Sequence, residues 1–163
     1  MTTHPSILLI EDSPGECELF RLALVQTGLD VALYMECDPE AAFHFLTDRA
    51  GLHQSSLQAR PSPLQERDHP GLPSLILLDL QLRGQNGCDF LKRLRADPRF
   101  ASIPVVVFTT SDASSDIAAG YANGTNGYVV KPGTFDELVR FVRDLCGYWL
   151  KWNRTLSMVE TKC

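Results

Sequence analysis

Two short apolar runs in the sequence end directly in acidic residues. The run Ser6 to Ile10 is followed by Glu11 and Asp12, and the run 74–78 is followed by Asp79. Such runs are too short for an ordinary helix and do not alternate with polar residues, so they predict strands buried on both faces. Ligands of open parallel sheets bind beyond the carboxyl ends of the strands. The three carboxylates are therefore candidates for one site.

The chemistry expected of this site is phosphoryl transfer. Three crowded carboxylates repel one another and stay ionised only when they share a cation, and oxygen ligands with room for water suit Mg²⁺ or Mn²⁺. A hydroxyl, Thr109, follows the apolar run 103–108, and an amine, Lys131, follows the run 127–130. A divalent ion, a hydroxyl and a lysine can hold a phosphoryl group and neutralise its charge, with Asp79 as the nucleophile that forms an acyl phosphate.

The elements that must position these residues alternate along the chain. Apolar, β-prone runs are separated by stretches with helical spacing, and the predicted strands are 6–10, 31–35, 74–79, 103–108 and 127–130. This alternation is typical of an α/β sandwich with a parallel sheet and right-handed crossovers. We predict a flavodoxin-like (βα)5 fold with a five-stranded sheet of order 2-1-3-4-5, which gathers Glu11, Asp12 and Asp79 at one edge.

Two helix starts carry the sequence pattern of a capping box. Ser13 and Thr134 each stand three residues before a glutamate, Glu16 and Glu137. In a capping box the hydroxyl accepts from the backbone of the glutamate, and the glutamate carboxylate accepts from the backbone of the capping residue. A weak helix over 114–122 is low in bulky side chains, and we expect it to be loosely held.

The chain is predicted to form one domain over residues 1–148. Within it, the segment 47–73 has prolines at 61, 63, 70 and 73 among polar residues, which predicts a long surface loop. A linker between two domains is disfavoured, because the residues before it are too few to fold alone. Residues 149–163 are expected to form an extension of the last helix and a tail.

Composition excludes several function classes. The formal net charge of −5 argues against nucleic-acid binding, and no basic cluster overrides it. No apolar run approaches membrane-spanning length, and the N-terminus lacks a signal-peptide pattern, so we expect no membrane partner and a cytoplasmic location. The five scattered cysteines lack metal-site spacing and are expected to be free thiols in a reducing compartment.

Four motifs, each at a predicted strand end, resemble the receiver domain of two-component response regulators. They are Ile-Glu-Asp at 10–12, Leu-Leu-Asp-Leu at 77–80, Phe-Thr-Thr at 108–110 and Tyr-Val-Val-Lys-Pro at 128–132. Each motif alone is weak, whereas all four in order are specific, and the resemblance covers residues 6–148. Within the family, the chain most resembles the stand-alone regulators that partner bacterial phytochromes. The long segment before the third strand and the aromatic-rich end of the last helix support this narrower resemblance.

The resemblance implies a phosphoacceptor at Asp79. This residue would accept a phosphoryl group from a sensor histidine kinase, which could be a bacterial phytochrome. Glu11, Asp12 and Asp79 would bind Mg²⁺ (or Mn²⁺) together with the backbone carbonyl of Gln81. Family members usually have a cis peptide bond before the proline that corresponds to Pro132. A cis bond is accessible there because it precedes a proline.

The resemblance also assigns roles around the acceptor. Thr109 would be the switch hydroxyl that turns toward the phosphoryl group. Tyr128 would be the aromatic residue whose inward swing reports the movement of Thr109, and Lys131 would form an ion pair with the phosphoryl oxygens. The chain departs from the family pattern at Arg83, where a proline is usual, and at Thr110, where a small residue is usual. Arg83 is expected to make its loop more flexible, and the bulk of Thr110 to slow attack by water.

The implied function is a switch without an output domain. The protein is not expected to be an enzyme, and the reactions expected of it are self-catalysed phosphotransfer and slow autodephosphorylation. About fifteen residues follow Tyr148, too few for a DNA-binding or catalytic module. Output is then expected through an unknown downstream protein and a homodimer formed by the helix 4–strand 5–helix 5 face. Trp149 and Trp152 either pack on their own domain or join a partner surface.

Two alternative functions can be tested against the sequence. A haloacid-dehalogenase type of aspartyl-phosphate phosphatase would carry a second aspartate two residues after the nucleophile, where this chain has Gln81. A degenerate receiver, acting as a binding module independent of phosphorylation, would have lost the acidic pair, Asp79 or Lys131, and all of these are present.

Overall fold

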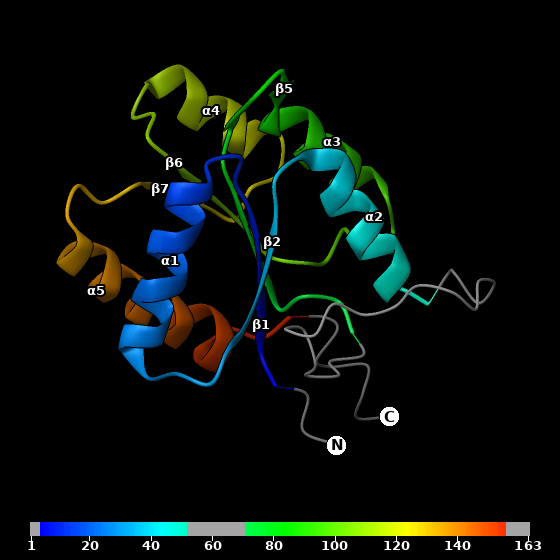
Figure 1. The fold of residues 1–163 in the computed structure, drawn as a ribbon. Helices are drawn as coiled ribbons and strands as arrows, with labels where there is room; N and C mark the ends of the chain where they lie inside the picture. The colour runs from blue at the N-terminus through cyan, green and yellow to red at the C-terminus, as the bar shows by residue number, and fades with distance from the viewer. Residues whose placement is uncertain (1–3, 52–70, 156–163) are drawn as a thin grey trace.

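The computed structural model describes residues 4–51 and 71–155, and its centre is a parallel five-stranded sheet with strand order β2-β1-β3-β6-β7 (Figure 1). Numbered among these five strands alone, the order is 2-1-3-4-5, which confirms the predicted flavodoxin-like topology. The strands are β1 (Ser6–Ile10), β2 (Ala32–Glu36), β3 (Leu75–Leu78), β6 (Val105–Thr109) and β7 (Gly127–Val130).

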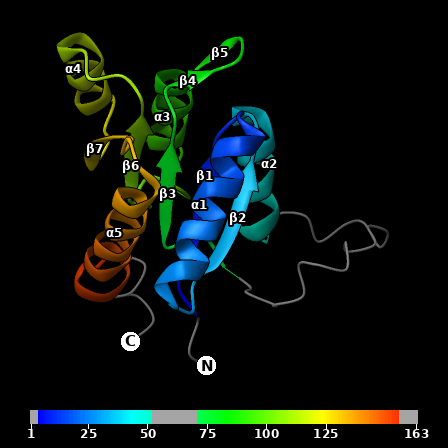
Figure 2. The same cartoon turned by 60° about the vertical axis from the view of Figure 1, so that its left-hand side comes forward.

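Helices cover both faces of the sheet. Figure 2 shows α1 and α5 together on one face, and α2 and α3 on the opposite face. The helices are α1 (Pro14–Thr27), α2 (Pro39–Arg49), α3 (Gly87–Ala96), α4 (Ser114–Ala122) and α5 (Phe135–Cys146). No helix among the described residues is both long and apolar enough to cross a membrane.

The central strands are buried on both faces, as their apolar runs predict. Side chains of successive strand residues point to opposite faces, so each central strand feeds two cores. In β1, Ile7 and Leu9 pack in the core beneath α1 and α5, whereas Leu8 and Ile10 pack in the core beneath α2 and α3. This double burial fixes the sheet and therefore the positions of the strand ends.

The two predicted capping boxes have different outcomes. At α5, Thr134 Oγ1 accepts from the backbone N–H of Glu137, and Glu137 Oε2 accepts from the backbone N–H of Thr134, both at 3.3 Å. At α1, Ser13 Oγ accepts from the backbone N–H of Glu16 at 3.4 Å, but Ser13 N–H donates to Glu11 Oε1 at 3.0 Å. The α1 capping box is thus half formed, because Glu11 occupies the donor that Glu16 would have taken.

A hairpin absent from the sequence prediction follows Asp79. It pairs β4 (Gln81–Leu82) with β5 (Gln85–Asn86) and turns at Gly84, whose φ is 71°. The chain then enters α3 at Gly87, where an added Cβ would lie 2.5 Å from the backbone oxygen of Asp79. Only glycine allows the helix to start this close to the end of β3.

The predicted boundaries differ from the structure at two places. Helix α2 continues to Arg49, three residues into the segment predicted as a loop from residue 47. Most of that segment, 52–70, lies outside the described residues, as does the end of the predicted tail, 156–163. After α5 the chain continues as a π-helical segment, η1 (Gly147–Trp152), so a helical extension does follow the last α-helix as far as the structure describes the chain.

Candidate functional site

The carboxyl ends of four strands converge on one buried polar site. Backbone hydrogen bonds tie each strand end to its neighbour: Asp79 N–H donates to Ile10 O at 3.1 Å, and Lys131 N–H donates to Thr109 O at 2.8 Å. The side chains of Glu11 and Asp79 are buried, and Thr109 is fully buried. The register of the sheet therefore brings together residues that are far apart in the sequence.

Lys131 lies among three carboxylates. Its Nζ donates to Glu11 Oε2 at 2.6 Å and to Asp79 Oδ2 at 2.7 Å, and it also contacts the carboxylate of Glu16. Burial disfavours the charged ammonium, but its hydrogen bonds to Asp79, Glu11 and Glu16 outweigh that cost, so the pKa of Lys131 lies above its ordinary value. The lysine is charged and its three donor protons are all used.

The site retains excess negative charge around this single ammonium. Ligand oxygens of Glu11, Glu16 and Asp79 lie within 4.8 Å of one another. Burial raises the pKa of Glu11 to about 7, although hydrogen bonds from Lys131 and from the Ser13 backbone act in the opposite direction. A set of oxygen donors with unbalanced negative charge fits a hard divalent cation such as Mg²⁺ or Mn²⁺.

The predicted metal ligands are only partly brought together. Glu11 and Asp79 share the carboxylate cluster, but of the residues that the structure describes, Glu16 rather than Asp12 completes it. Asp12 Oδ2 instead accepts from the Arg83 backbone N–H at 2.9 Å and pairs with Arg83 Nε at 3.5 Å. Arg83, which was expected to make its loop more flexible, therefore has a defined partner in Asp12.

Gln81 lies directly beside Asp79. Its backbone N–H donates to Asp79 Oδ1 at 2.9 Å, and its side-chain Oε1 accepts from Thr110 Oγ1 at 3.2 Å. The two oxygens of the Asp79 carboxylate are therefore held separately, one by Gln81 and the other by Lys131. The metal-ligand role of the Gln81 carbonyl stays a prediction.

Tyr128 is tied to the loop that follows β6. Its hydroxyl donates to Ser111 O at 3.0 Å, and burial raises the pKa of the phenol. Its ring packs against Gly120 of α4, where an added Cβ would lie 3.2 Å from Tyr128 Cδ2. Thr109 Oγ1 accepts from the Ser111 backbone N–H at 3.5 Å. Ser111 therefore connects the predicted switch hydroxyl with the predicted switch aromatic.

The peptide bond before Pro132 is trans, since the described residues contain no cis bond. The cis bond expected from the family resemblance is thus absent in this structure.

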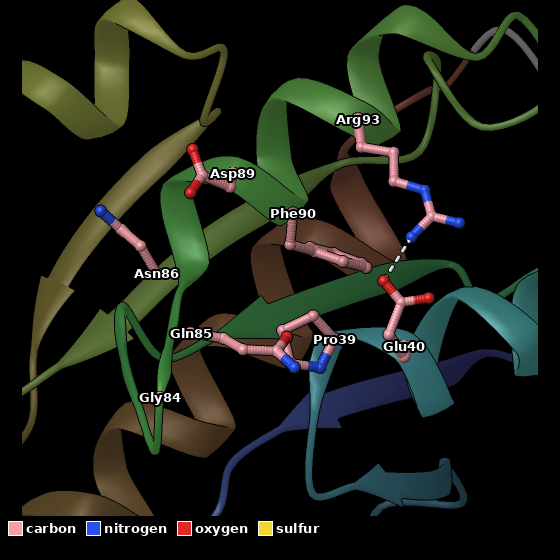
Figure 3. A pocket seen from close by; sticks show the side chains of 8 residues that line it. All are labelled: Pro39, Glu40, Gly84, Gln85, Asn86, Asp89, Phe90 and Arg93. Atoms are coloured by element: carbon pink, nitrogen blue, oxygen red, sulfur yellow. Dashed lines mark hydrogen bonds and ion pairs between the residues drawn. The ribbon is translucent and has the colours of Figure 1, made fainter.

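A separate cavity of about 290 Å³ lies behind the β4–β5 hairpin, between the hairpin, α2 and α3 (Figure 3). Arg93 borders it and pairs with Glu40 at 2.7 Å, and the Arg93 guanidinium lies 3.7 Å from the centre of the Phe43 ring. Asp79, Lys131 and Glu11 do not line this cavity.

Glu16 is the residue at the site that sequence reasoning missed, because its pattern was fully explained by a capping box. The available signal was Glu11, which stands two residues before Ser13 and can accept its backbone N–H. Once that donor is taken, the Glu16 carboxylate is left to pair with Lys131.

Known proteins are similar to the chain in sequence and in fold. Residues 55–143, which include Asp79, Thr109, Tyr128 and Lys131, match the family model of the response regulator receiver domain. The chain is 33% identical to the probable methanogenesis regulatory protein FilR2 of Methanothrix harundinacea, over 91% of this chain and 86% of that protein.

Solved structures extend this similarity. The phosphorylated cyanobacterial phytochrome response regulator RcpA superposes with a TM-score of 0.74 at 28% identity, over 94% of this chain and 99% of that one. The Mn²⁺-bound form of response regulator Rcp1, a protein of Synechocystis sp., has a TM-score of 0.70 at 31% identity, over 92% of this chain and 97% of that one. The expected resemblance to phytochrome response regulators is thereby confirmed.

Proposed function

Because the chain belongs to the response regulator receiver domain family, we propose that it is a switch operated by phosphorylation of Asp79. One observation carries this proposal: the buried Asp79 carboxylate is held between the Gln81 N–H and the Lys131 ammonium at the end of β3. These contacts support the proposal, because they would orient a carboxylate oxygen as a nucleophile and would provide a cation for the developing phosphoryl charge.

In the proposed reaction, an oxygen of Asp79 attacks the phosphorus of a phosphohistidine on a histidine kinase. A new P–O bond forms, the P–N bond breaks, and the histidine nitrogen leaves with the electron pair. Lys131 neutralises the transferred phosphoryl oxygens. Bound Mg²⁺ or Mn²⁺ would add positive charge at the same oxygens. Glu11, Asp12, Asp79 and the Gln81 carbonyl would hold that ion.

The switch would run from Thr109 to Tyr128. The Thr109 hydroxyl would turn toward the phosphoryl group, which removes the acceptor of the Ser111 N–H. Ser111 also accepts from the Tyr128 hydroxyl, so movement of this loop changes the anchor of the aromatic ring. Phosphorylation at the end of β3 would in this way alter the surface of α4 and β7.

The proposed output is a protein interface on the α4–β7–α5 face, which is the helix 4–strand 5–helix 5 face of the family. Apolar side chains from each of these elements are exposed, namely Tyr121, Val130 and Phe135. Exposed aromatic and aliphatic groups of this kind are typical of interfaces. A second copy of the chain is the proposed partner on this face, and a phytochrome-type histidine kinase is the proposed phosphodonor, on the strength of the similarity to RcpA.

Labelling with a small phosphodonor tests the proposal. The protein is incubated with acetyl phosphate and Mg²⁺, phosphate is mapped by mass spectrometry, and Asp79→Asn serves as the control. Metal-dependent label on Asp79 that is absent from the variant supports the switch, and a simultaneous change in size-exclusion volume supports the dimer face. Absence of both label and Mg²⁺ binding would refute the phosphoacceptor and favour a binding module independent of phosphate.

A further inference from the structure

Glu16 has a place at the site that its position in the sequence does not explain. We propose that Glu16 restrains Lys131 before phosphoryl transfer: its carboxylate occupies one donor proton of the ammonium and gives up that contact to the arriving phosphoryl group. This inference rests on the proposed function, since it concerns the same reaction.

The first support is the comparison of two glutamates at equivalent helix positions. Glu137 closes its capping box at the start of α5, so its carboxylate is used by the backbone of Thr134. Glu16 has the same position in α1, but Glu11 accepts the N–H that Glu16 would cap. The Glu16 carboxylate is thereby directed to Lys131. Glu137 therefore caps its helix, whereas Glu16 pairs with Lys131 at the site.

The second support is the number of hydrogen bonds that Lys131 can donate. An ammonium has three donor protons, and the three carboxylates of Glu11, Asp79 and Glu16 use all of them. A phosphoryl oxygen on Asp79 can therefore pair with Lys131 only if one existing contact is released. The lysine is occupied, rather than free, before the reaction.

The third support identifies which contact is released. The side chain of Glu11 is 3% exposed and that of Asp79 is 7% exposed, whereas that of Glu16 is 40% exposed. A carboxylate that is already partly hydrated loses little when it returns to water, but a buried carboxylate left without its partner is costly. Asp79 becomes the acyl phosphate itself, so a phosphoryl oxygen takes over the contact of its carboxylate. Of the two glutamates, Glu16 is the one that a further phosphoryl oxygen displaces, while Glu11 continues to hold Lys131 in place.

This role predicts how the charge of Glu16 affects phosphorylation. An anionic donor approaching Asp79 meets the Glu16 carboxylate and competes with it for Lys131. Glu16→Gln removes the charge at nearly constant shape, so labelling by doubly charged acetyl phosphate should be faster by about five-fold, the upper range measured for exposed ion pairs, since Glu16 is the partly exposed partner. Labelling by singly charged phosphoramidate should accelerate less, and high salt should reduce both gains.

The experiment compares initial labelling rates of wild type, Glu16→Gln and Glu137→Gln with both donors, at low and high salt. Glu137→Gln is the matched control, because it removes the same charge from the equivalent helix position away from Lys131. The expected result is acceleration in Glu16→Gln alone, larger for acetyl phosphate. Labelling of Glu16→Gln that is equal to or slower than that of wild type with both donors would overturn the proposal. If Glu16→Gln also bound Mg²⁺ more weakly than wild type, Glu16 would be reassigned as a metal ligand.

A spectroscopic measurement on the unaltered protein avoids any effect of substitution on folding. Beryllofluoride is used as a stable mimic of the phosphoryl group, and the side-chain carboxyl carbons of glutamate are followed by NMR. The Glu16 resonance should shift when the mimic binds and Lys131 is released, while that of Glu137 should not. A bound mimic with an unchanged Glu16 resonance would contradict the displacement. If wild type neither labels at Asp79 nor binds the mimic, the proposed function itself fails, and this inference fails with it.

Discussion

Two sheltered basic side chains lie at opposite ends of the sheet. Lys131 lies at the carboxyl ends of the strands and contacts the carboxylates of Glu11, Glu16 and Asp79. Arg95 lies near the amino ends of β6 and β7, where it donates to the backbone oxygens of Gly124 (2.9 Å), Ala101 (3.0 Å) and Ile103 (2.8 Å) and to Asn126 Oδ1 (2.8 Å).

The partners of these two cations determine what each end of the sheet can do. Carboxylates can be protonated, bind a metal ion or be phosphorylated, so the environment of Lys131 can change. Backbone carbonyls and an amide are neither protonated nor phosphorylated at neutral pH, so the environment of Arg95 is much less open to change. The pKa values differ accordingly: burial lowers the pKa of Arg95, whereas carboxylates raise that of Lys131. One end of the sheet is suited to chemistry, and at the other end Arg95 holds the α3–β6 and α4–β7 loops together.

The largest expected effect separates the two residues by function. Lys131→Met should slow Asp79 labelling by about 100-fold, because it removes the cation that faces the developing phosphoryl charge. Arg95→Met, assayed under conditions in which it is folded, should label at a rate close to that of wild type. Mass-spectrometric time courses with acetyl phosphate measure both. Similar losses in the two variants would show that the assignment of chemistry to one end is wrong.

The next effect concerns stability. Arg95→Met should lower the free energy of unfolding by about 2 kcal/mol, because four acceptors, two of them in partly buried hydrogen bonds, lose their donor at once. Mg²⁺ should not restore this loss, since the proposed metal site lies at the other end of the sheet. Urea unfolding with and without Mg²⁺ tests this, and an unfolding midpoint equal to that of wild type would exclude Arg95 as the structural centre of these loops.

A smaller, pH-dependent effect is expected at the Lys131 end. Burial raises the pKa of Glu11 from 4.5 to about 7 in the folded protein, so the fold favours the protonated acid. The stability from this group is present below the unfolded pKa and is lost as the pH rises through about 7. Without metal, the stability of wild type relative to Glu11→Gln should therefore fall between pH values of about 5 and 8.

Urea unfolding of both proteins across this pH range measures the difference. Saturating Mg²⁺ should reduce the fall, because the ion stabilises the ionised carboxylates. A relative stability that is flat with pH, or that rises, would show that Lys131 compensates Glu11 fully.

The smallest effect is expected at the edge of the site. Arg83 pairs with Asp12, but its side chain is 88% exposed. Arg83→Ala should change stability by less than about 0.5 kcal/mol and should tighten Mg²⁺ binding about two-fold, because Asp12 loses a competing cation. Calorimetric titration of Mg²⁺ provides the measurement. Weaker binding in the variant would indicate that the Arg83 side chain instead holds Asp12 in a productive orientation.

The sequence predicted the features of this molecule that depend on local hydrophobic pattern. Unbroken apolar runs identify the central strands, and the alternation with helices gives the strand order, so the neighbourhood of Glu11, Asp79, Thr109 and Lys131 follows from strand ends alone. Those parts were predictable because burial on two faces admits few other arrangements.

The details that were missed depend on competition between individual groups. Glu16 was interpreted as a cap because the pattern does not show that Glu11 takes the Ser13 donor. The contacts of Asp12 with the Arg83 backbone and side chain were also not predicted, whereas its role as a metal ligand stays a prediction. The role of Glu16 depends on which of two acceptors reaches one donor, and the contacts of Asp12 depend on where the hairpin places Arg83. Both are determined by the geometry of the folded loops rather than by residue type.

The close approach of Gly87 to the backbone of Asp79 limits which residues can stand at position 87. An added methyl group at position 87 would press on the carbonyl of the acceptor residue and on Leu80 Cα, 2.9 Å away. Among random substitutions selected for phosphoacceptor activity, we expect position 87 to tolerate almost no change, although it contributes no chemical group. The nearby hairpin turn should vary far more freely, so mutational tolerance should change sharply within a few residues.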